Sequence, residues 1–323
     1  MDKKDTIIVL LPVEEGYRRQ MEEALPGAAF IWTEGGIVPP EAWEKASAIL
    51  GNPTLEQAAR CPNLRWIQLG SAGTDGYCAP GALPEPVALT NATGCYGHAI
   101  SEYMVGTTLM LMKKLHLYRD SQMAGRWQDA GAVMSVTSSR ILVVGMGDIG
   151  GSYAQRMKLL GAHITGVTRT AHPKPDYADE AGTIGQLDGF LPQADVVALS
   201  LPGGEKTAKL MDRRRLGLMK RGALLLNVGR GSAIDTDALY DLLESGQLGG
   251  AALDVTDPEP LPEGHPLWKC PSAFITPHTS GGYHMRETYE AVMAVCIENL
   301  KAFAAGRPFT HQVDRETGYM RRG

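Results

Sequence analysis

The chain of 323 residues has few cysteines, no long apolar run and no large excess of either charge. Its five cysteines are odd in number, scattered and without the spacing of metal ligands: Cys61, Cys78, Cys95, Cys270 and Cys296. This usage favours a reducing cytosol over a disulfide framework, and it predicts no metal site. Before Pro12 only the stretch Thr6–Leu11 is apolar or nearly so, which is too short for the core of a signal peptide. We therefore expect a cytoplasmic protein.

Membranes and nucleic acids are also disfavoured as partners. The apolar stretch Met104–Met112 is bounded by Glu102 and Lys113, well short of the ~20 residues of a membrane-spanning helix. The formal net charge of -5 disfavours binding to nucleic acid or to an anionic membrane, since both need clustered cations. The glycosylation sequence Asn91-Ala92-Thr93 has meaning only in a secreted protein, so we treat it as chance.

Length and composition predict two globular α/β domains. At ~150 residues for each domain, a chain of 323 residues suggests two, and its 44% of hydrophobic residues is enough for large cores. The first part of the chain alternates strand-like and helix-like segments, which is typical of a parallel α/β unit. Strands are expected at residues 7–11, 28–32, 48–50, 65–69 and 87–90, and an amphipathic helix at 14–25.

A second α/β unit follows a long helical stretch, which we expect from Ala99 to Met123. This unit continues through a strand at Arg140–Val144 as far as His278, and a last helix is expected over residues 285–304. Because a closing helix can return to the first domain, we predict a central domain, residues 99–284, inserted into a discontinuous outer domain, residues 1–98 and 285–323.

A glycine-rich turn, Gly145-Met146-Gly147-Asp148-Ile149-Gly150, follows an apolar strand and precedes an expected helix, Ser152–Leu160. Its glycines permit a tight turn and close approach of the backbone to a pyrophosphate, while the helix N-terminus adds free amides and a positive dipole end. Glycine-rich turns also serve plain packing, but the strand–turn–helix context favours a dinucleotide site. We therefore predict that the central domain binds a dinucleotide through Gly145, Gly147, Asp148, Ile149 and Gly150.

The end of the next expected strand indicates which dinucleotide is bound. An NAD-selective site usually has an acidic residue about 20 residues after the glycine turn, where it bonds the ribose 2′-hydroxyl. This chain has Thr168-Arg169-Thr170 instead, so that no carboxylate repels a 2′-phosphate and the planar fork of Arg169 can bind one. The alternative is a basic loop in solvent, with Asp176 or Asp179 reaching back to the ribose. We predict NADP(H) as the preferred cofactor and NAD(H) as the second choice.

Arg230, Glu259 and His278 each lie after an apolar, strand-like run: residues 223–228, 250–255 and 273–276. Residues past the carboxyl ends of parallel strands face the ligand crevice. A guanidinium can bind the carboxylate and keto oxygen of a 2-oxo acid together, and an imidazole can donate a proton to that oxygen. A neighbouring carboxylate favours the charged imidazolium. Singly, the arginine is equally well a strand cap and the other two are surface residues, but the ordered set favours reduction of a 2-oxo acid.

These motifs resemble the D-isomer-specific 2-hydroxyacid dehydrogenase family over nearly the whole chain. The matching stretches are Ser71-Ala72-Gly73-Thr74-Asp75, residues 145–150, 227–231 and 253–261, Pro277-His278, and the ending at 306–314. The resemblance implies an α/β fold with two Rossmann-like, doubly wound parallel-sheet domains, the cofactor domain being inserted into a discontinuous substrate domain. It also implies a homodimer that assembles through the cofactor domain.

The resemblance further implies roles for single residues. Arg230 binds and polarises the substrate, and His278 is the general acid–base with Glu259 as its partner. The backbone amides of Ala72 and Gly73 receive the substrate carboxylate. The implied cofactor contacts, beside the glycine turn and Thr168-Arg169-Thr170, are Leu201, Pro202, Val228, Gly229, Asp254, His278 and Ser280, with Asp254 near the nicotinamide carboxamide. In Thr168-Arg169 the chain is similar to the NADP-preferring hydroxypyruvate and glyoxylate reductase branch.

The sequence thus predicts NADPH-linked reduction of a small 2-oxo acid, such as glyoxylate or hydroxypyruvate, to a D-2-hydroxy acid. One alternative is an NAD-dependent oxidiser of formate or phosphite, against which the pairing of Glu259 with His278 argues. Another is a dinucleotide-sensing, corepressor-like protein without turnover, because such proteins can retain the three residues. Side-chain selectivity is expected to depend on residues 9–14, 72–77 and 95–98, which leaves the particular acid open. Trp127 is expected to pack against a subunit or domain.

Overall fold

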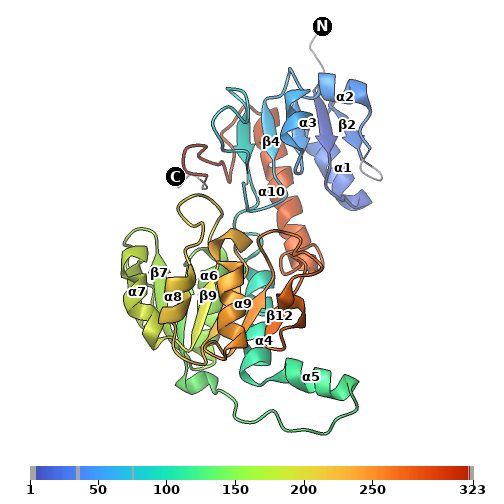
Figure 1. Ribbon diagram of the computed structural model, residues 1–323. Helices are drawn as coiled ribbons and strands as arrows, with labels where there is room; N and C mark the ends of the chain where they lie inside the picture. The colour runs from blue at the N-terminus through green and yellow to red at the C-terminus, as the bar shows by residue number, and fades with distance from the viewer. Residues whose placement is uncertain (1–4, 34–36, 75, 319, 321–323) are drawn as a thin grey trace. The chain divides into compact units, whose positions relative to one another are not determined.

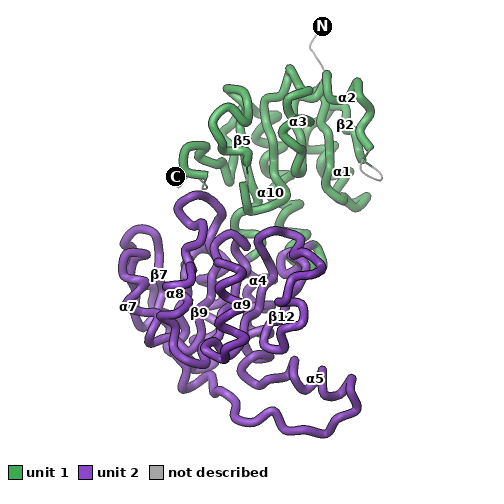
Figure 2. The backbone as a smooth tube through the Cα atoms, viewed as in Figure 1, with its two compact units in different colours: residues 1–96, 283–323 green, residues 97–282 purple. Residues whose placement is uncertain are grey.

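The computed structural model describes residues 5–33, 37–74, 76–318 and 320, so Asp75 of the Ser71–Asp75 stretch lies outside the described residues. The chain divides into two compact units (Figure 2), unit 1 with residues 1–96 and 283–323 and unit 2 with residues 97–282. Unit 2 is therefore an insertion in the sequence of unit 1.

Unit 1 is built on a five-stranded parallel sheet of order β2-β1-β3-β4-β5. This is a doubly wound order, with the chain starting near one edge and extending to both sides. The last helix, α10, packs against the first, α1, where the rings of Tyr17 and Tyr289 meet edge to face at 5.6 Å. The elements are β1 (Thr6–Val9), α1 (Glu15–Ala24), β2 (Ala29–Trp32), α2 (Pro40–Lys45), β3 (Ala48–Leu50), α3 (Leu55–Ala59), β4 (Trp66–Gln68), β5 (Ala88–Thr90) and α10 (Arg286–Ala304).

Unit 2 is built on a seven-stranded parallel sheet of order β12-β11-β10-β9-β6-β7-β8. Helices α8 and α9 pack together on one face of the sheet, and α4 and α6 pack together on the other (Figure 1). The strands are β6 (Arg140–Val144), β7 (His163–Thr168), β8 (Glu180–Thr183), β9 (Val196–Leu199), β10 (Leu224–Asn227), β11 (Gly250–Leu253) and β12 (Ala273–Ile275). The helices are α4 (Gly97–Met112), α5 (Leu115–Met123), α6 (Asp148–Leu159), α7 (Leu187–Phe190), α8 (Arg213–Leu218) and α9 (Thr236–Glu244).

The central strands of unit 2 are buried on both faces, which explains their nearly continuous apolar sequence. Val143, Val197 and Leu225 on three neighbouring strands have no solvent exposure. Such strands are typical of a parallel sheet that is covered by helices on both sides. The predicted fold class, two parallel-sheet α/β domains, is confirmed.

The single helical stretch predicted from Ala99 to Met123 is wrong, because the chain forms two helices there. Lys114 has φ 57°, a left-handed conformation that ends α4 before α5 begins. The ammonium groups of the two lysines at the break bond the returning chain: Lys113 Nζ donates to Met134 O at 2.7 Å and Lys114 Nζ to Ala130 O at 2.6 Å. Helix α5 and the chain that follows it project from the sheet of unit 2 and its helices (Figures 1 and 2), and these bonds tie the returning chain to the end of α4.

Within the described parts of the chain, no helix has the length and apolar content needed to cross a bilayer.

Candidate active site

The glycine turn lies at the carboxyl end of β6, where the strand order changes direction between β6 and β9. Gly145 has φ +99°, and a Cβ there would lie 2.6 Å from Ser200 O. A Cβ on Gly150 would lie 1.9 Å from Gly145 O, whereas no described atom lies within 4 Å of a Cβ on Gly147. Two glycines therefore allow the turn and its packing, and the middle one leaves room for a ligand to approach the backbone, as a dinucleotide pyrophosphate requires.

Helix α6 begins at Asp148, four residues before the expected start at Ser152, so its first amides belong to the glycine turn itself. The N-cap of this helix is Gly147, which has no side chain and so leaves the first amides of the helix without a side-chain cap. Helix N-termini with free amides suit anionic groups. The Asp148 carboxylate, predicted as a cofactor contact, lies against the first residue of α4, because a Cβ on Gly97 would be 2.2 Å from Asp148 Oδ1. Ile149 lies in the same first turn and is partly buried.

The segments after β9 and β10 meet beside the glycine turn. A Cβ on Gly229 would lie 2.4 Å from Leu201 O, and one on Gly145 would lie 3.2 Å from the Leu201 side chain. Val228 is buried, and Pro202 next to Leu201 is exposed. The candidate cofactor contacts at 201–202 and 228–229 therefore lie beside the glycine turn, at the carboxyl ends of the central strands.

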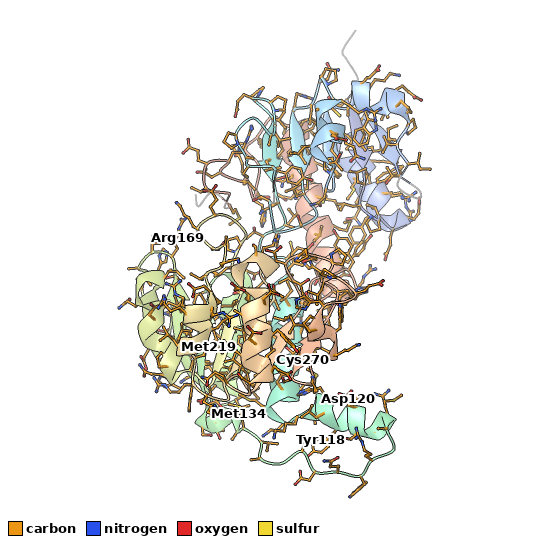
Figure 3. The ribbon with its side chains drawn as sticks, viewed as in Figure 1. Tyr118, Asp120, Met134, Arg169, Met219 and Cys270 are labelled. Atoms are coloured by element: carbon orange, nitrogen blue, oxygen red, sulfur yellow. The ribbon has the colours of Figure 1, made fainter. Side chains whose placement is uncertain are left out.

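Thr168, Arg169 and Thr170 stand at the carboxyl end of β7, where Arg169 is exposed (Figure 3). The hydroxyl of Thr168 donates to Thr170 O at 2.7 Å and fixes the bend. Asp179 does not reach this loop, because its carboxylate accepts from Lys158 Nζ at 2.6 Å and from the backbone N–H of Ile164, near the start of β7, at 2.8 Å. The bonds from the Lys158 ammonium and the Ile164 N–H hold the pKa of Asp179 below its ordinary value. Asp179, one of the two alternative acids for the ribose, is therefore hydrogen-bonded near the start of β7, at the end of the strand opposite Arg169.

Arg230 is held in a tight turn after β10. Asn227, which has no solvent exposure, donates from Nδ2 to Arg230 O at 2.9 Å and accepts from Gly229 N at 3.0 Å. The guanidinium donates to Gly229 O at 2.7 Å. A Cβ on Gly231 would lie 1.9 Å from Thr256 O, so only glycine lets this turn touch the loop that carries Glu259.

The side chains of His278 and Glu259 are hydrogen-bonded, with 2.7 Å between His278 Nδ1 and Glu259 Oε1. A carboxylate accepts only, so the proton of this bond lies on Nδ1 and the Nε2 atom is left for another partner. With Nδ1 bonded to the carboxylate, the ring is oriented so that Nε2 can give a proton to an oxygen.

The turn that carries His278 is anchored on Asp254, whose carboxylate is almost fully buried. One oxygen of Asp254 accepts from Thr276 Oγ1 at 2.6 Å and Thr279 N at 2.9 Å, and the other accepts from the backbone N–H and hydroxyl of Ser280. The amide of His278 donates to Asp254 O at 2.8 Å. These bonds hold His278 at φ 51°, a conformation that residues other than glycine rarely adopt. Asp254 and Ser280, predicted as cofactor contacts, therefore bond each other here.

Ala72 and Gly73 lie in unit 1, in the loop that follows β4. Ala72 O accepts from Asn91 Nδ2 at 2.7 Å, and Asn52 donates to the hydroxyl of Ser71 at 2.8 Å. Asn91 follows β5 and Asn52 follows β3, on either side of β4 in the sheet. Sequence reasoning missed both asparagines, although the rule that selected Arg230 and His278, a polar residue just past a strand, also applies to them.

Comparison with known proteins shows the family of the chain. Residues 105–280 match the family profile described as D-isomer specific 2-hydroxyacid dehydrogenase, NAD binding domain. The crystal structure of a D-isomer specific 2-hydroxyacid dehydrogenase family protein from Aeromonas salmonicida is 31% identical with a TM-score of 0.85, and the match covers 97% of this chain and 99% of that one.

Two further relatives extend the comparison. A D-isomer specific 2-hydroxyacid dehydrogenase from Xanthobacter autotrophicus, solved with NADPH and MES, is 27% identical with a TM-score of 0.82, covering 98% of this chain and 100% of that one. A glyoxylate reductase from Thermofilum pendens is 28% identical over 267 residues, which is 79% of this chain and 76% of that protein. The profile spans more than half of the chain, and the chain accordingly belongs to the D-isomer specific 2-hydroxyacid dehydrogenases, a family of oxidoreductases.

Proposed function

We propose that the protein reduces small 2-oxo acids, of the size of glyoxylate or hydroxypyruvate, to D-2-hydroxy acids with NADPH. In this proposal unit 2 binds the dinucleotide and unit 1 binds the substrate. The observation that carries it is the pair of His278 and Glu259 at 2.7 Å, on a loop that contacts the Arg230 turn. Arg230, Glu259 and His278 follow β10, β11 and β12, at the carboxyl ends of the strands. The glycine turn follows β6 at the same end of the sheet.

In this proposal, different residues bind the cofactor, bind the substrate and transfer the proton. The glycine turn and the first amides of α6 would hold the pyrophosphate of the dinucleotide, which supplies the hydride when bound. The Arg230 guanidinium binds the substrate carboxylate and draws charge toward the keto oxygen. His278 gives that oxygen the proton from Nε2, and Glu259 keeps the imidazole ring in place through Nδ1. The backbone amides of Ala72 and Gly73 supply further hydrogen bonds to the substrate carboxylate.

Arg169 is the basis for proposing NADPH over NADH, since it replaces the acid that would repel a 2′-phosphate. Replacing Arg169 with alanine is expected to raise the KM for NADPH about tenfold or more, because a hydrogen bond to a charged group contributes about 1.5–3 kcal/mol. The KM for NADH should stay within about twofold, as NADH carries no phosphate there. Arg221→Ala, which removes an exposed arginine elsewhere in unit 2, is the control and should change neither value.

Initial rates with purified protein test the proposal as a whole. NADPH and NADH are compared across glyoxylate, hydroxypyruvate, pyruvate, 2-oxoisocaproate and phenylpyruvate, and NAD⁺ is tested with formate and phosphite. Oxidation of NADPH by any of the 2-oxo acids supports the reductase, and the best acid defines the pocket. Better use of NADH would overturn the cofactor preference alone. Tight cofactor binding without turnover of any acid would favour the sensing protein instead.

A homodimer through unit 2 is the second part of the proposal. Large apolar side chains gather on the projecting arm, residues 115–133, where Leu115, Met123, Trp127 and Val133 are exposed. A cavity of about 420 Å³ lies beside the arm at the amino end of β12, opposite the end that carries His278, with Asp120 and Cys270 in its lining (Figure 3). Apolar surface of this kind marks protein interfaces.

Light scattering tests the dimer. The wild type should give twice the mass of one chain, and the double variant Trp127→Ser with Met123→Ser should give the mass of one chain. A wild-type monomer would contradict the dimer.

A further inference from the structure

The loop of residues 70–73 in unit 1 has every one of its carbonyl oxygens bonded within the protein. Gly70 O accepts from the hydroxyl groups of Tyr96 and Tyr283, and Ser71 O accepts from the backbone N–H of Ala92 at 3.0 Å. Ala72 O accepts from Asn91 Nδ2 at 2.7 Å, and Gly73 O accepts from the hydroxyl of Ser71 at 2.8 Å.

The backbone N–H groups of the same loop, unlike its carbonyl oxygens, are mostly not bonded to described residues. The backbone N–H groups of Ser71, Ala72 and Gly73 donate to no acceptor among the described residues. Since C=O and N–H point in opposite directions across a planar trans peptide, each bond to a carbonyl also fixes the direction of the next amide. Three successive amides are thus turned away from the groups that hold their carbonyls. Backbone N–H groups without an acceptor inside the protein are donors from which an anion can accept.

The donors that hold the carbonyls are themselves fixed. Asn91 is almost fully buried, and its Oδ1 accepts from Thr93 N at 3.3 Å, which orients Nδ2 toward Ala72. Burial raises the pKa of Tyr96 far above its ordinary value, so its hydroxyl stays a donor to Gly70 O. Asn52 secures the start of the loop, accepting from Gly70 N at 3.0 Å and donating to the Ser71 hydroxyl at 2.8 Å.

We propose that Asn91 is a positioning residue for the substrate carboxylate: by bonding Ala72 O it aims the Gly73 amide at that carboxylate. This inference rests on the proposed function of the loop. It assigns to Asn91 a contribution to substrate affinity that does not involve touching the substrate. The nitrogen that would carry a glycan in the sequence Asn91-Ala92-Thr93 is the one that makes this bond.

The test compares substrate affinity with turnover in Asn91→Ala and Asn91→Asp, both of which lose the donor. With saturating NADPH, the KM for glyoxylate should rise about tenfold while kcat stays within about twofold, because one charge-assisted hydrogen bond is misdirected. The dissociation constant of oxalate from the complex with NADP⁺, measured by calorimetry, should rise by the same factor. The dissociation constant of NADPH should not change. Unchanged KM and oxalate binding in folded variants would overturn the proposal.

Two further variants distinguish a positioning role of Asn91 from a general loss of stability. Asn299 is another fully buried asparagine of unit 1, and it bonds Gln68 and Thr310 instead of the loop. Asn299→Ala should lower the melting temperature but leave oxalate binding unchanged; an equal loss of oxalate binding there would overturn the proposal. Asn52 is exposed, so Asn52→Ala gives a folded protein even where the Asn91 variants do not, and it should also weaken oxalate. If the wild type turns over no 2-oxo acid, the proposed function fails while the oxalate comparison still decides the role of Asn91.

Discussion

Replacing His278 with alanine is expected to lower kcat about 10²–10⁴-fold, the usual scale for removal of a general acid. The geometry points to this residue because Glu259 occupies its Nδ1 atom at 2.7 Å and no other histidine pairs with Glu259 among the described residues. The side chain of His278 is 47% exposed, so its loss should cost little stability. Stopped-flow rates at saturating NADPH and glyoxylate measure the effect, with the melting temperature recorded beside them. Turnover near that of the wild type would reject the role of His278 as proton donor.

Glu259→Gln tests the charge of Glu259 separately from its hydrogen bond. The amide oxygen of glutamine can still accept the bond from His278 Nδ1, so only the negative charge is removed. The negative carboxylate stabilises positive charge on the ring that donates the proton. Glu259→Gln is therefore expected to lower kcat/KM for reduction, but by less than His278→Ala does. Initial rates with NADPH and glyoxylate measure both variants. A kcat/KM in Glu259→Gln equal to that of the wild type would show that the charge of Glu259 does not act on His278.

The parts of the fold that the sequence predicts well are those decided by local sterics and apolar patterning. The spacing of Gly145, Gly147 and Gly150 is readable because a side chain at the first or last position would collide with neighbouring backbone, at 2.6 Å and 1.9 Å respectively. The apolar strands at 140–144 and 224–227 are readable because a parallel sheet buries both faces. The residue that follows such a strand is then placed at the ligand edge by topology alone.

Other features depend on contacts between segments distant in the sequence. The break at Lys114 follows no helix-breaking residue; it goes with bonds from Lys113 and Lys114 to carbonyls of the returning chain, at 2.7 Å and 2.6 Å. Strand β8, Glu180–Thr183, lies at the sheet edge and has no fully buried residue, so it lacks the apolar signal of the central strands. The start of α6 at Asp148 was also missed, since glycines at 150 and 151 disfavour a helix by propensity.

The site shows the same division. Arg230, Glu259 and His278 were selected by type and position, but the anchoring of the His278 turn on Asp254 requires bonds from Thr276, Thr279 and Ser280. The resemblance to the family implies that Asp254 is a cofactor contact, and in the structure its buried oxygens accept hydrogen bonds from the turn itself. Asn91 carried only a glycosylation pattern in the sequence. Its bond to Ala72 O spans 19 residues and follows from the pairing of β4 with β5.

Arg230→Lys is expected to lower kcat/KM about 10²-fold, although it keeps the positive charge. A guanidinium presents parallel N–H donors that match a carboxylate and a neighbouring keto oxygen, whereas an ammonium is a single point charge. The loss of one charge-assisted hydrogen bond, about 1.5–3 kcal/mol, accounts for a factor of about 10 to 150. The effect should appear with every 2-oxo acid tested, because all share the carboxylate and keto group. Initial rates across the same acids measure it.

The competing explanation is that Arg230 only caps the end of β10, and it leads to a different outcome. A structural arginine would lower the melting temperature and affect NADPH binding as much as substrate use, since the Gly229–Arg230 turn adjoins Leu201 in the candidate cofactor site. A substrate-binding arginine predicts an unchanged NADPH dissociation constant in Arg230→Lys, together with loss of oxalate binding. Arg230→Ala adds a second criterion: free guanidinium in solution should restore part of its turnover, as it can occupy the space of the missing side chain. Full kcat/KM in Arg230→Lys would exclude two-point binding of the substrate by this residue and leave charge alone as its contribution.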